Sequence, residues 1–136
     1  MSVSSGPKLF EFETIDWVDE RASATAAPEL VEAAERAGAR RKKLARGEGG
    51  FHLQYTTMPA GFDVPMHSHN FDELFIVVRG GCTFWPDGSD HSVELKERDS
   101  ATLAANHEYA FRCGPEGMEF YVVRQGEAAP TKMAPA

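Results

Sequence analysis

The sequence predicts an all-β protein, a single antiparallel barrel or sandwich that is preceded by an N-terminal arm and one short helix. Three observations support this prediction. From about residue 39 onward, short stretches of alternating or continuous apolar residues recur at close spacing. Clusters of turn-forming residues, such as Gly47 to Gly50 and Pro86 to Gly88, separate these stretches. No helical pattern lies between them, which favours a closed β-structure.

The N-terminal segment, residues 1–38, is predicted to form the arm and the helix. In Lys8 to Thr14, apolar side chains alternate with Lys and Glu, a pattern typical of a short strand that pairs with the main body or with a partner subunit. Pro28 to Gly38 has Pro at the first helical position, an apolar stripe of Leu and Ala, and Gly at the end, which together indicate a short amphipathic helix.

The remaining strands define the main body, residues 39–126, and a flexible tail, residues 127–136, follows it. The tail is rich in Ala and Pro, and we expect it to lack regular structure. The predicted strands are, in chain order, Ala39 to Ala45, Phe51 to Met58, Leu74 to Val78, Cys82 to Trp85, Ser92 to Leu95, Ser100 to Leu103, Tyr109 to Cys113 and Met118 to Arg124.

Composition limits the classes of protein that are possible. A chain of 136 residues has room for one domain with one core. Its net charge of -7 argues against a nucleic acid or an anionic membrane as partner. The longest apolar run, Leu74 to Val78, is far below the roughly 18 residues of a membrane span. Cys82 and Cys113 form no C-x-x-C pattern and no secretory signal precedes them, so we expect reduced thiols in a cytoplasmic protein.

The most informative stretch runs from Gly61 to Gly80 and reads G-x5-H-x-H-x3-E-x6-G. Its polar members are His67, His69 and Glu73. Side chains alternate between the two faces of a strand, so these three are expected to project to the same side of a hairpin. Two imidazole nitrogens and one carboxylate oxygen would then surround one interior point, which predicts a metal site.

This donor set suits one divalent transition metal, with Fe(II) as the first choice and Mn, Ni, Co or Zn as alternatives. Three protein ligands leave coordination positions open. A metal with open positions can bind O2 or a substrate oxygen, polarise it, or acidify a water molecule. The predicted partner is therefore a small-molecule substrate.

The Gly61-to-Gly80 pattern resembles the first motif of the cupin superfamily. The resemblance extends over roughly Ala39 to Arg124 and implies a small barrel of two antiparallel sheets, also described as a jelly roll or double-stranded β-helix. It further implies a metal inside the barrel and a homodimer. The barrel hosts dioxygenases, isomerases, decarboxylases, lyases and non-catalytic sensors, so the resemblance alone does not assign an activity.

The second cupin motif, which supplies a fourth ligand, a His, is altered in this chain. Only Asp99 matches it, and Tyr109 stands where the family has its His. Three outcomes are open. Tyr109 ligates the metal as a phenolate, it remains a neutral phenol that serves as a hydrogen-bond donor or acid/base group, or His107 becomes the ligand instead. We favour the second outcome, because two His and one carboxylate already form a complete set.

Other residues are weaker candidates for the site. His107 is expected to be an exposed loop residue, and His52 and Gln54 share a strand face that lines either the pocket or solvent. Arg112 and Arg124 are expected to face solvent, as Arg usually does. The aromatic residues are expected to fill the core. They are Phe62, Phe71, Phe75, Phe84, Trp85 and Phe111.

Among the apolar residues, Phe75 and Val77 share the phase of Glu73 and are the best candidates to line the pocket. From these residues the sequence predicts a metal-dependent enzyme of the dioxygenase type, with Tyr109 as its catalytic group. Two alternatives remain open. The first is a non-catalytic ligand-binding or sensor protein, and the second is a metal-dependent lyase or isomerase.

Overall fold

The computed structural model describes residues 6–19, 32, 38–87, 90–126 and 130–133, the last range by its backbone only. Regular structure in these ranges is almost entirely β, as predicted. Two short 3-10 helices and eight strands follow one another in the order η1 (Phe12–Thr14), β1 (Arg40–Arg46), η2 (Glu48–Gly50), β2 (His52–Met58), β3 (Asp63–His69), β4 (Glu73–Trp85), β5 (Val93–Lys96), β6 (Ser100–Leu103), β7 (Tyr109–Arg124) and β8 (Pro130–Met133).

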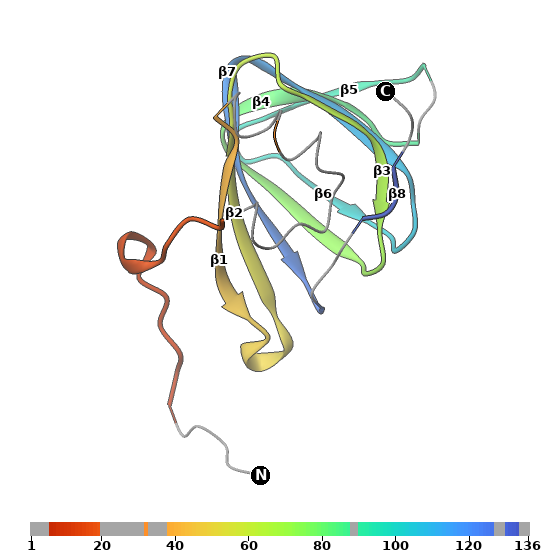
Figure 1. Ribbon diagram of the computed structural model, residues 1–136. Coiled ribbons are helices and arrows are strands. Elements are labelled where there is room, and N and C mark those ends of the chain that lie inside the picture. The colour runs from red at the N-terminus through yellow and green to blue at the C-terminus, as the bar shows by residue number, and fades with distance from the viewer. Residues whose placement is uncertain (1–5, 20–31, 33–37, 88–89, 127–129, 134–136) are drawn as a thin grey trace.

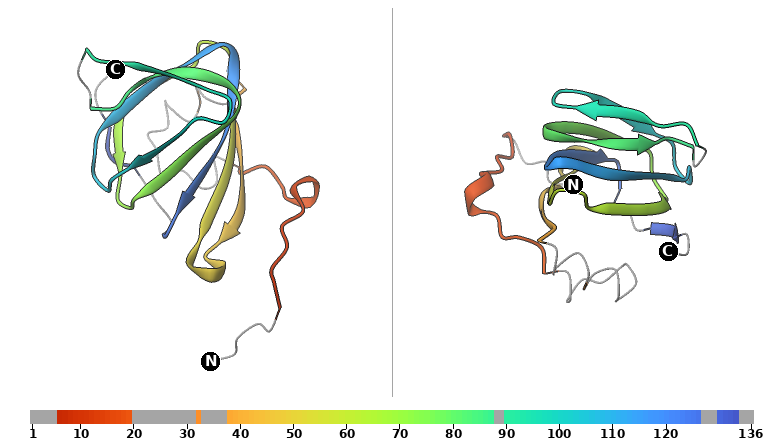
Figure 2. Two further views of the ribbon diagram at one scale, coloured as in Figure 1. Left: turned by 180° about the vertical axis from the view of Figure 1, so that it is seen from behind. Right: turned by 90° about the horizontal axis from the view of Figure 1, so that it is seen from above.

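Two long antiparallel strands, β4 and β7, organise the barrel. The second half of β7 pairs with β2 and its first half pairs with β3. The first half of β4 pairs with β6 and its second half pairs with β5. β4 and β7 also pair with each other over nearly their whole length, and both bend over the top of the barrel in Figure 1. Both faces of this jelly-roll barrel therefore depend on the same two strands, as Figure 2 shows from two further directions.

The predicted breaks inside β4 and β7 are wrong. We expected a turn at residues 79–81 and a break at residues 114–117, but each long strand is continuous. The pairing of β4 with β7 shifts register on both sides of Gly80, whose φ is 73°. A glycine with positive φ at a bulge lets a strand bend while its neighbours stay paired. The glycines that resemble turn residues in the sequence therefore mark bends within strands.

The N-terminal arm lies beside β1 but is not the predicted strand. Lys8 to Thr14 contains the 3-10 helix η1, and the Val18 backbone N–H donates to the Arg41 carbonyl at 2.8 Å. The Lys42 ammonium is buried under the arm, donates to the Phe12 carbonyl at 2.7 Å and lies 4.0 Å from the centre of its ring. Cation–π and hydrogen-bond contacts, rather than strand pairing, therefore hold the arm.

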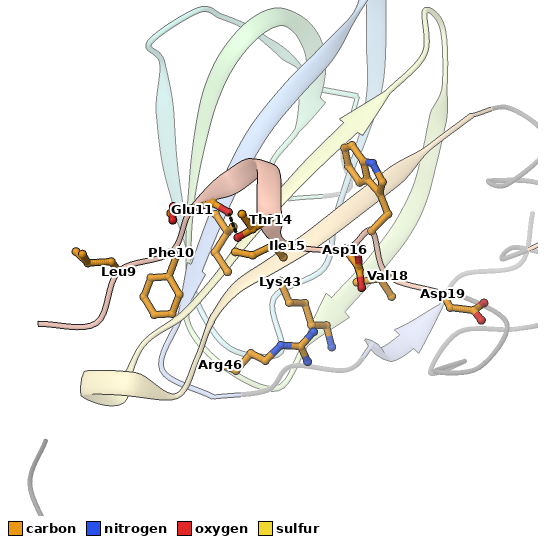
Figure 3. Close-up of a pocket in the computed structure, with 12 residues that line it drawn as sticks. Leu9, Phe10, Glu11, Thr14, Ile15, Asp16, Val18, Asp19, Lys43 and Arg46 are labelled. Atoms are coloured by element: carbon orange, nitrogen blue, oxygen red, sulfur yellow. Dashed lines mark hydrogen bonds between the residues drawn. The ribbon is translucent and has the colours of Figure 1, made fainter.

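A surface cavity of about 530 Å³ separates this arm from β1. Figure 3 shows the residues around it, which include Phe10, Ile15 and Val18 from the arm and Lys43 and Arg46 from β1. None of the predicted site residues lines this cavity. It is a feature of the attachment of the arm, separate from the barrel interior.

The predicted helix from Pro28 to Gly38 lies outside the described residues, apart from Glu32 and Gly38. Within the predicted flexible tail, Pro130–Met133 instead form β8, which pairs with β3. No helix in the part of the chain that the structure describes is long and apolar enough to cross a membrane. The division at residues 38 and 126 and the homodimer stay predictions.

The core is built from the inward-facing residues of β4 and β7, with Leu103 of β6. Phe75, Val77 and Phe84 of β4 are at most 2% exposed. The Phe75 ring stacks on Phe120 of β7 with centroids 4.5 Å apart. Cys82 and Cys113 are buried free thiols at opposite positions of β4 and β7. Such a core fills the middle of the barrel, and the polar site lies beside it, where the start of β4 and the two ends of β7 meet.

Candidate functional site

The structure brings together the four side chains that the sequence predicts for the site. His67 and His69 are alternate residues at the end of β3, and Glu73 is the first residue of β4. Tyr109 begins β7 and pairs directly with His67. β3 ends at His69 and β4 begins at Glu73, so a short connection places the carboxylate beside the imidazoles. Glu73 is buried there, at the start of β4.

The distances within this group are short. The ring centroids of His67 and His69 are 4.9 Å apart, and those of His67 and Tyr109 are 4.5 Å apart. The Tyr109 hydroxyl donates to Glu73 Oε1 and Oε2 at 3.4 and 3.5 Å. His69 Nε2 lies 3.9 Å from Glu73 Oε1. His67, Glu73 and Tyr109 are 6, 5 and 3% exposed, so these three side chains lie inside the barrel.

Arg124 also belongs to this group, contrary to the prediction that it faces solvent. It is the last residue of β7 and pairs directly with Glu73 of β4. Its side chain is only 11% exposed, and its Nη2 lies 3.6 Å from Glu73 Oε2. Arg112, by contrast, is exposed as predicted and forms a surface ion pair with Asp63 at 2.7 Å. The two ends of β7, Tyr109 and Arg124, therefore meet at the same carboxylate.

The sequence contains a signal for Arg124 that the prediction did not use. Met118, Phe120 and Val122 are all buried and alternate along β7. Arg124 continues this alternation with the same phase, which predicts an inward side chain at the end of the strand. Arginine usually faces solvent, but the position of Arg124 in the alternating pattern of β7 decides the direction of its side chain.

The protonation states follow from burial. Burial lowers the pKa of His67, an effect that the hydrogen bond to Pro65 opposes and the positive charge of Arg124 reinforces. Burial raises the pKa of Glu73, although Arg124 and the Tyr109 hydroxyl both stabilise its anion. Burial and then the charge of Glu73 raise the pKa of Tyr109 well above its ordinary value. Tyr109 therefore keeps its proton in the metal-free protein, and its role toward a metal stays a prediction.

A backbone carbonyl group next to the site, that of Pro65, fixes the orientation of the His67 ring. Its Nδ1 lies 2.8 Å from the Pro65 carbonyl oxygen, which can only accept, so Nδ1 carries the proton. The Nε2 lone pair is then available for another partner. A backbone carbonyl that holds one nitrogen while the other binds a cation is the usual arrangement of a metal-ligating His.

These residues fit a metal in kind but do not form a ready cation site as their side chains stand. A neutral imidazole, a second imidazole and a buried carboxylate match the donors of two-His-one-carboxylate centres. Among the described residues, however, no group of three or more His, Cys, Asp or Glu is arranged to hold a metal ion. Glu73 Oε1 faces His69, whereas Oε2 faces Arg124. One carboxylate oxygen is thus on the imidazole side of the group.

Several weaker candidates do not join the site. His107 is exposed and its Nε2 contacts the Pro86 carbonyl oxygen, so it is not placed as a fourth ligand. Gln54 instead accepts from Arg41 at 3.1 Å on the β1 side of β2. Phe75 and Val77 are part of the closed core. Phe71 is 36% exposed, so it does not belong to the predicted aromatic core.

A cavity of about 460 Å³ reaches the group from the side of β6. Glu73 and Arg124 line it, and Leu74, Leu103 and Val123 contribute apolar walls. Two charged groups beside apolar walls are typical of a site for a small organic molecule that carries a charge. Of the residues in the group, Glu73 and Arg124 are thus the two that line this cavity.

Comparisons with known proteins agree with this fold. The sequence matches the family model described as the cupin domain over residues 54–124, more than half of the chain. The protein therefore belongs to the cupin family. Among curated proteins, no sequence matches this chain significantly.

Solved structures with similar folds share little sequence with this chain. KdgF from Halomonas sp. is 16% identical, with a TM-score of 0.66, over 90% of this chain and 96% of that one. An RmlC-like cupin from Shewanella frigidimarina is 18% identical, with a TM-score of 0.63, over 87% and 90% of the two chains. A structure described as the DMSP lyases RdDddP and RnDddQII is 16% identical, with a TM-score of 0.66, over 89% and 63%. At these identities the likeness establishes the fold alone.

Proposed function

We propose that this cupin is a metal-dependent enzyme of the dioxygenase type that acts on a small organic substrate. His67, His69 and Glu73 would hold one divalent transition metal, with iron as the first choice. The observation that carries the proposal is the proximity of these three side chains: the rings of His67 and His69 are 4.9 Å apart and His69 Nε2 lies 3.9 Å from Glu73 Oε1, with Tyr109 and a surface cavity beside them. When bound there, iron would supply the activation of O2 that amino-acid side chains cannot provide.

The chain's own residues would bind and orient the substrate. The Pro65 carbonyl keeps the proton of His67 on Nδ1 and turns Nε2 inward. Glu73 keeps Oε1 on the side of His69 while Oε2 remains beside Arg124. The neutral Tyr109 hydroxyl would donate a hydrogen bond to a substrate oxygen on which negative charge develops. The core aromatics behind the site would exclude water from it.

A lyase or isomerase is the second candidate. It is favoured by the position of Tyr109, because a buried phenol that donates a hydrogen bond to a carboxylate can pass a proton back and forth without any oxidant. The fold it shares with a structure described as DMSP lyases is compatible with this reaction class. In this case the metal would act as a Lewis acid.

A non-catalytic binding protein is the third candidate. The ion pair between Arg124 and Glu73 favours it, because a guanidinium group already stands near the carboxylate that a metal would use. The absence of a ready three-donor arrangement among the described residues points the same way. The test below separates these three candidates.

The experiment measures metal uptake and turnover together. Purified protein is stripped with a chelator and reloaded with Fe(II) or Zn(II), and its metal content is measured by mass spectrometry. We expect about one metal per chain in the wild type, loss of that metal in His69→Gln, and wild-type content in His107→Gln, whose histidine is exposed. Equal uptake by the wild type and His69→Gln would refute the metal site.

Oxygen consumption and the role of Tyr109 decide the reaction class. Iron-loaded protein that consumes O2 with a small organic substrate supports the dioxygenase, whereas turnover with zinc and no O2 uptake supports the lyase. Tyr109→Phe is expected to keep its metal and lower turnover by roughly 100-fold or more. Tyr121→Phe, which changes a tyrosine packed against Tyr55 outside the site, is the matched control. If metal-loaded protein turns over none of the substrates tested, the non-catalytic binding protein is the candidate that the result supports.

A further inference from the structure

We propose that Arg124 binds the carboxylate group of the substrate, which makes small carboxylic acids the substrate class of this site. This inference rests on the proposed function, because it concerns the same cavity. It starts from the hydrogen-bonding state of the guanidinium group. A guanidinium has five N–H donors and no acceptor, and buried donors of this kind are nearly always paired.

The side chain of Arg124 is only 11% exposed, and one of its donors is unpaired. Its Nε is fully buried and has no hydrogen-bond partner among the residues that the structure describes. Its Nη2 faces Glu73 Oε2 at 3.6 Å, which is longer than a charge-assisted hydrogen bond. If Arg124 served only to neutralise Glu73, we would expect short paired contacts with that carboxylate. The guanidinium group of Arg124 instead has room for a second hydrogen-bond acceptor.

The surroundings of Arg124 define that acceptor. Arg124 and Glu73 are both among the residues that line the cavity of about 460 Å³. Leu103, which is buried and pairs directly with Glu73, lines the same cavity and would contact the carbon skeleton of a ligand. A planar guanidinium prefers a planar anion with two oxygens, and a carboxylate fits that geometry. A cavity of this size accommodates a molecule with a short aliphatic chain or one aromatic ring.

Arg112 shows what an arginine of this protein looks like when it is a surface residue. It lies on the same strand, and its Nε and Nη2 donate to the two oxygens of Asp63 at 2.7 and 3.3 Å. The exposed arginine is thus fully engaged in a fork-to-fork pair, whereas the buried one is not. This contrast makes Arg112→Gln a matched control for Arg124→Gln.

The test compares the binding of acids and of their uncharged amides. Succinate and benzoate, with succinamide and benzamide as neutral analogues, are titrated into metal-free and Zn(II)-loaded protein, and binding is followed by ligand-observed NMR. We expect the wild type to prefer each acid to its amide. Arg124→Gln should weaken binding of the acids by about 10- to 100-fold and leave the amides unchanged. Arg112→Gln should match the wild type.

Arg124→Lys provides the second variant, because Arg124→Gln leaves Glu73 without its counter-ion and can impair folding. Lysine retains the charge but not the fork, so we expect an acid affinity between those of the wild type and Arg124→Gln. Near-ultraviolet circular dichroism shows whether each variant keeps its packed core. If Arg124→Gln does not fold, an intermediate affinity of Arg124→Lys supports the proposal and wild-type affinity overturns it.

Two results would overturn the inference. One is unchanged acid affinity in a folded Arg124→Gln variant, and the other is a wild type that binds neither acid more tightly than about 10 mM in either metal state. These failures are distinct from failure of the proposed function. Arg124-dependent binding of acids without any metal uptake would retain the inference and refute the metal site. Metal uptake that depends on His69, together with acid binding that is unchanged in Arg124→Gln, would support the metal site and refute the inference.

Discussion

At the scale of single residues, burial controls the charges of the site. His67 and Glu73 are both buried, and in each the neutral form is favoured by desolvation, which lowers the pKa of the imidazole and raises that of the carboxyl. The two shifts therefore have opposite consequences for stability. The folded state releases a proton from His67 more readily than the unfolded chain does, and it holds a proton on Glu73 more readily.

The lowered pKa of His67 predicts a loss of stability in mild acid. Between its folded pKa and the ordinary value of 6.5, the unfolded chain binds a proton that the folded state does not. The free energy of unfolding of metal-free protein should therefore fall as the pH drops through 6.5 toward the folded pKa. In His67→Gln this part of the pH dependence should be absent.

The measurement is urea unfolding at a series of pH values between about 5 and 8, with the wild type compared with each variant. Glu73 contributes with the opposite sign, since its raised pKa adds stability as the pH falls, and the comparison with His67→Gln separates the two. His107→Gln, which removes an exposed histidine, should retain the wild-type slope. An identical slope in His67→Gln and the wild type would refute the assignment.

At the scale of elements, the bends of β4 and β7 place the site. β4 bends at Gly80, where an added Cβ would lie 2.1 Å from the Gly117 carbonyl oxygen. Gly117 is itself tightly packed, since its Cβ would lie 2.5 Å from the Met58 carbonyl oxygen. The close approach of β4, β7 and the end of β2 therefore depends on residues without side chains. This bend allows Tyr109 and Arg124, at opposite ends of β7, to reach one carboxylate.

We expect Gly80→Ala to destabilise the protein much more than Gly61→Ala. Both glycines have positive φ, at 73° and 69°, but an added Cβ at Gly61 meets nothing within 4 Å. Gly61→Ala should cost about 1 kcal/mol for the backbone conformation alone. Gly80→Ala should cost about 3 kcal/mol or more, because backbone atoms must also move apart. Denaturant unfolding of both variants measures the difference, and equal costs would contradict the packing argument.

At the scale of the whole molecule, one aromatic core supports both sheets. Phe75 and Phe84 of β4 pack against Phe111 and Phe120 of β7, with ring centroids between 4.5 and 6.2 Å apart. Tyr109 stacks on Phe84 at 5.5 Å, so the core continues directly into the site. The stability of the barrel and the position of the catalytic candidate therefore share the same contacts.

Phe75→Ala should lower the free energy of unfolding by about 3 to 5 kcal/mol, since the residue is 0% exposed and its removal leaves a cavity. Leu74→Ala is the matched control, because Leu74 is the neighbouring residue on the opposite face of β4 and is 37% exposed. Its cost should stay below about 1 kcal/mol. Urea unfolding measures both values, and similar costs for the two variants would contradict the assignment of the core.

The sequence by itself determined most of the local structure. The predicted strands at Ser100 to Leu103 and Phe51 to Met58 correspond to β6 and β2 within one residue, because alternation of side chains and flanking turn residues are local properties. The spacing of His67, His69 and Glu73 likewise predicted that they would meet. The place of Tyr109 in the altered second motif also predicted that it would lie beside them.

Only the tertiary structure decided the features that depend on contacts between distant segments. The continuous course of β4 and β7, the pairing of Pro130–Met133 with β3 and the place of Arg124 opposite Glu73 are all set by register between strands. Register is chosen by the packing of the whole barrel, and the local sequence around each residue does not contain it. For that reason the candidate donors and the inward phase of Arg124 could be read from the chain, whereas the pairing of Arg124 with Glu73 was found only in the folded molecule.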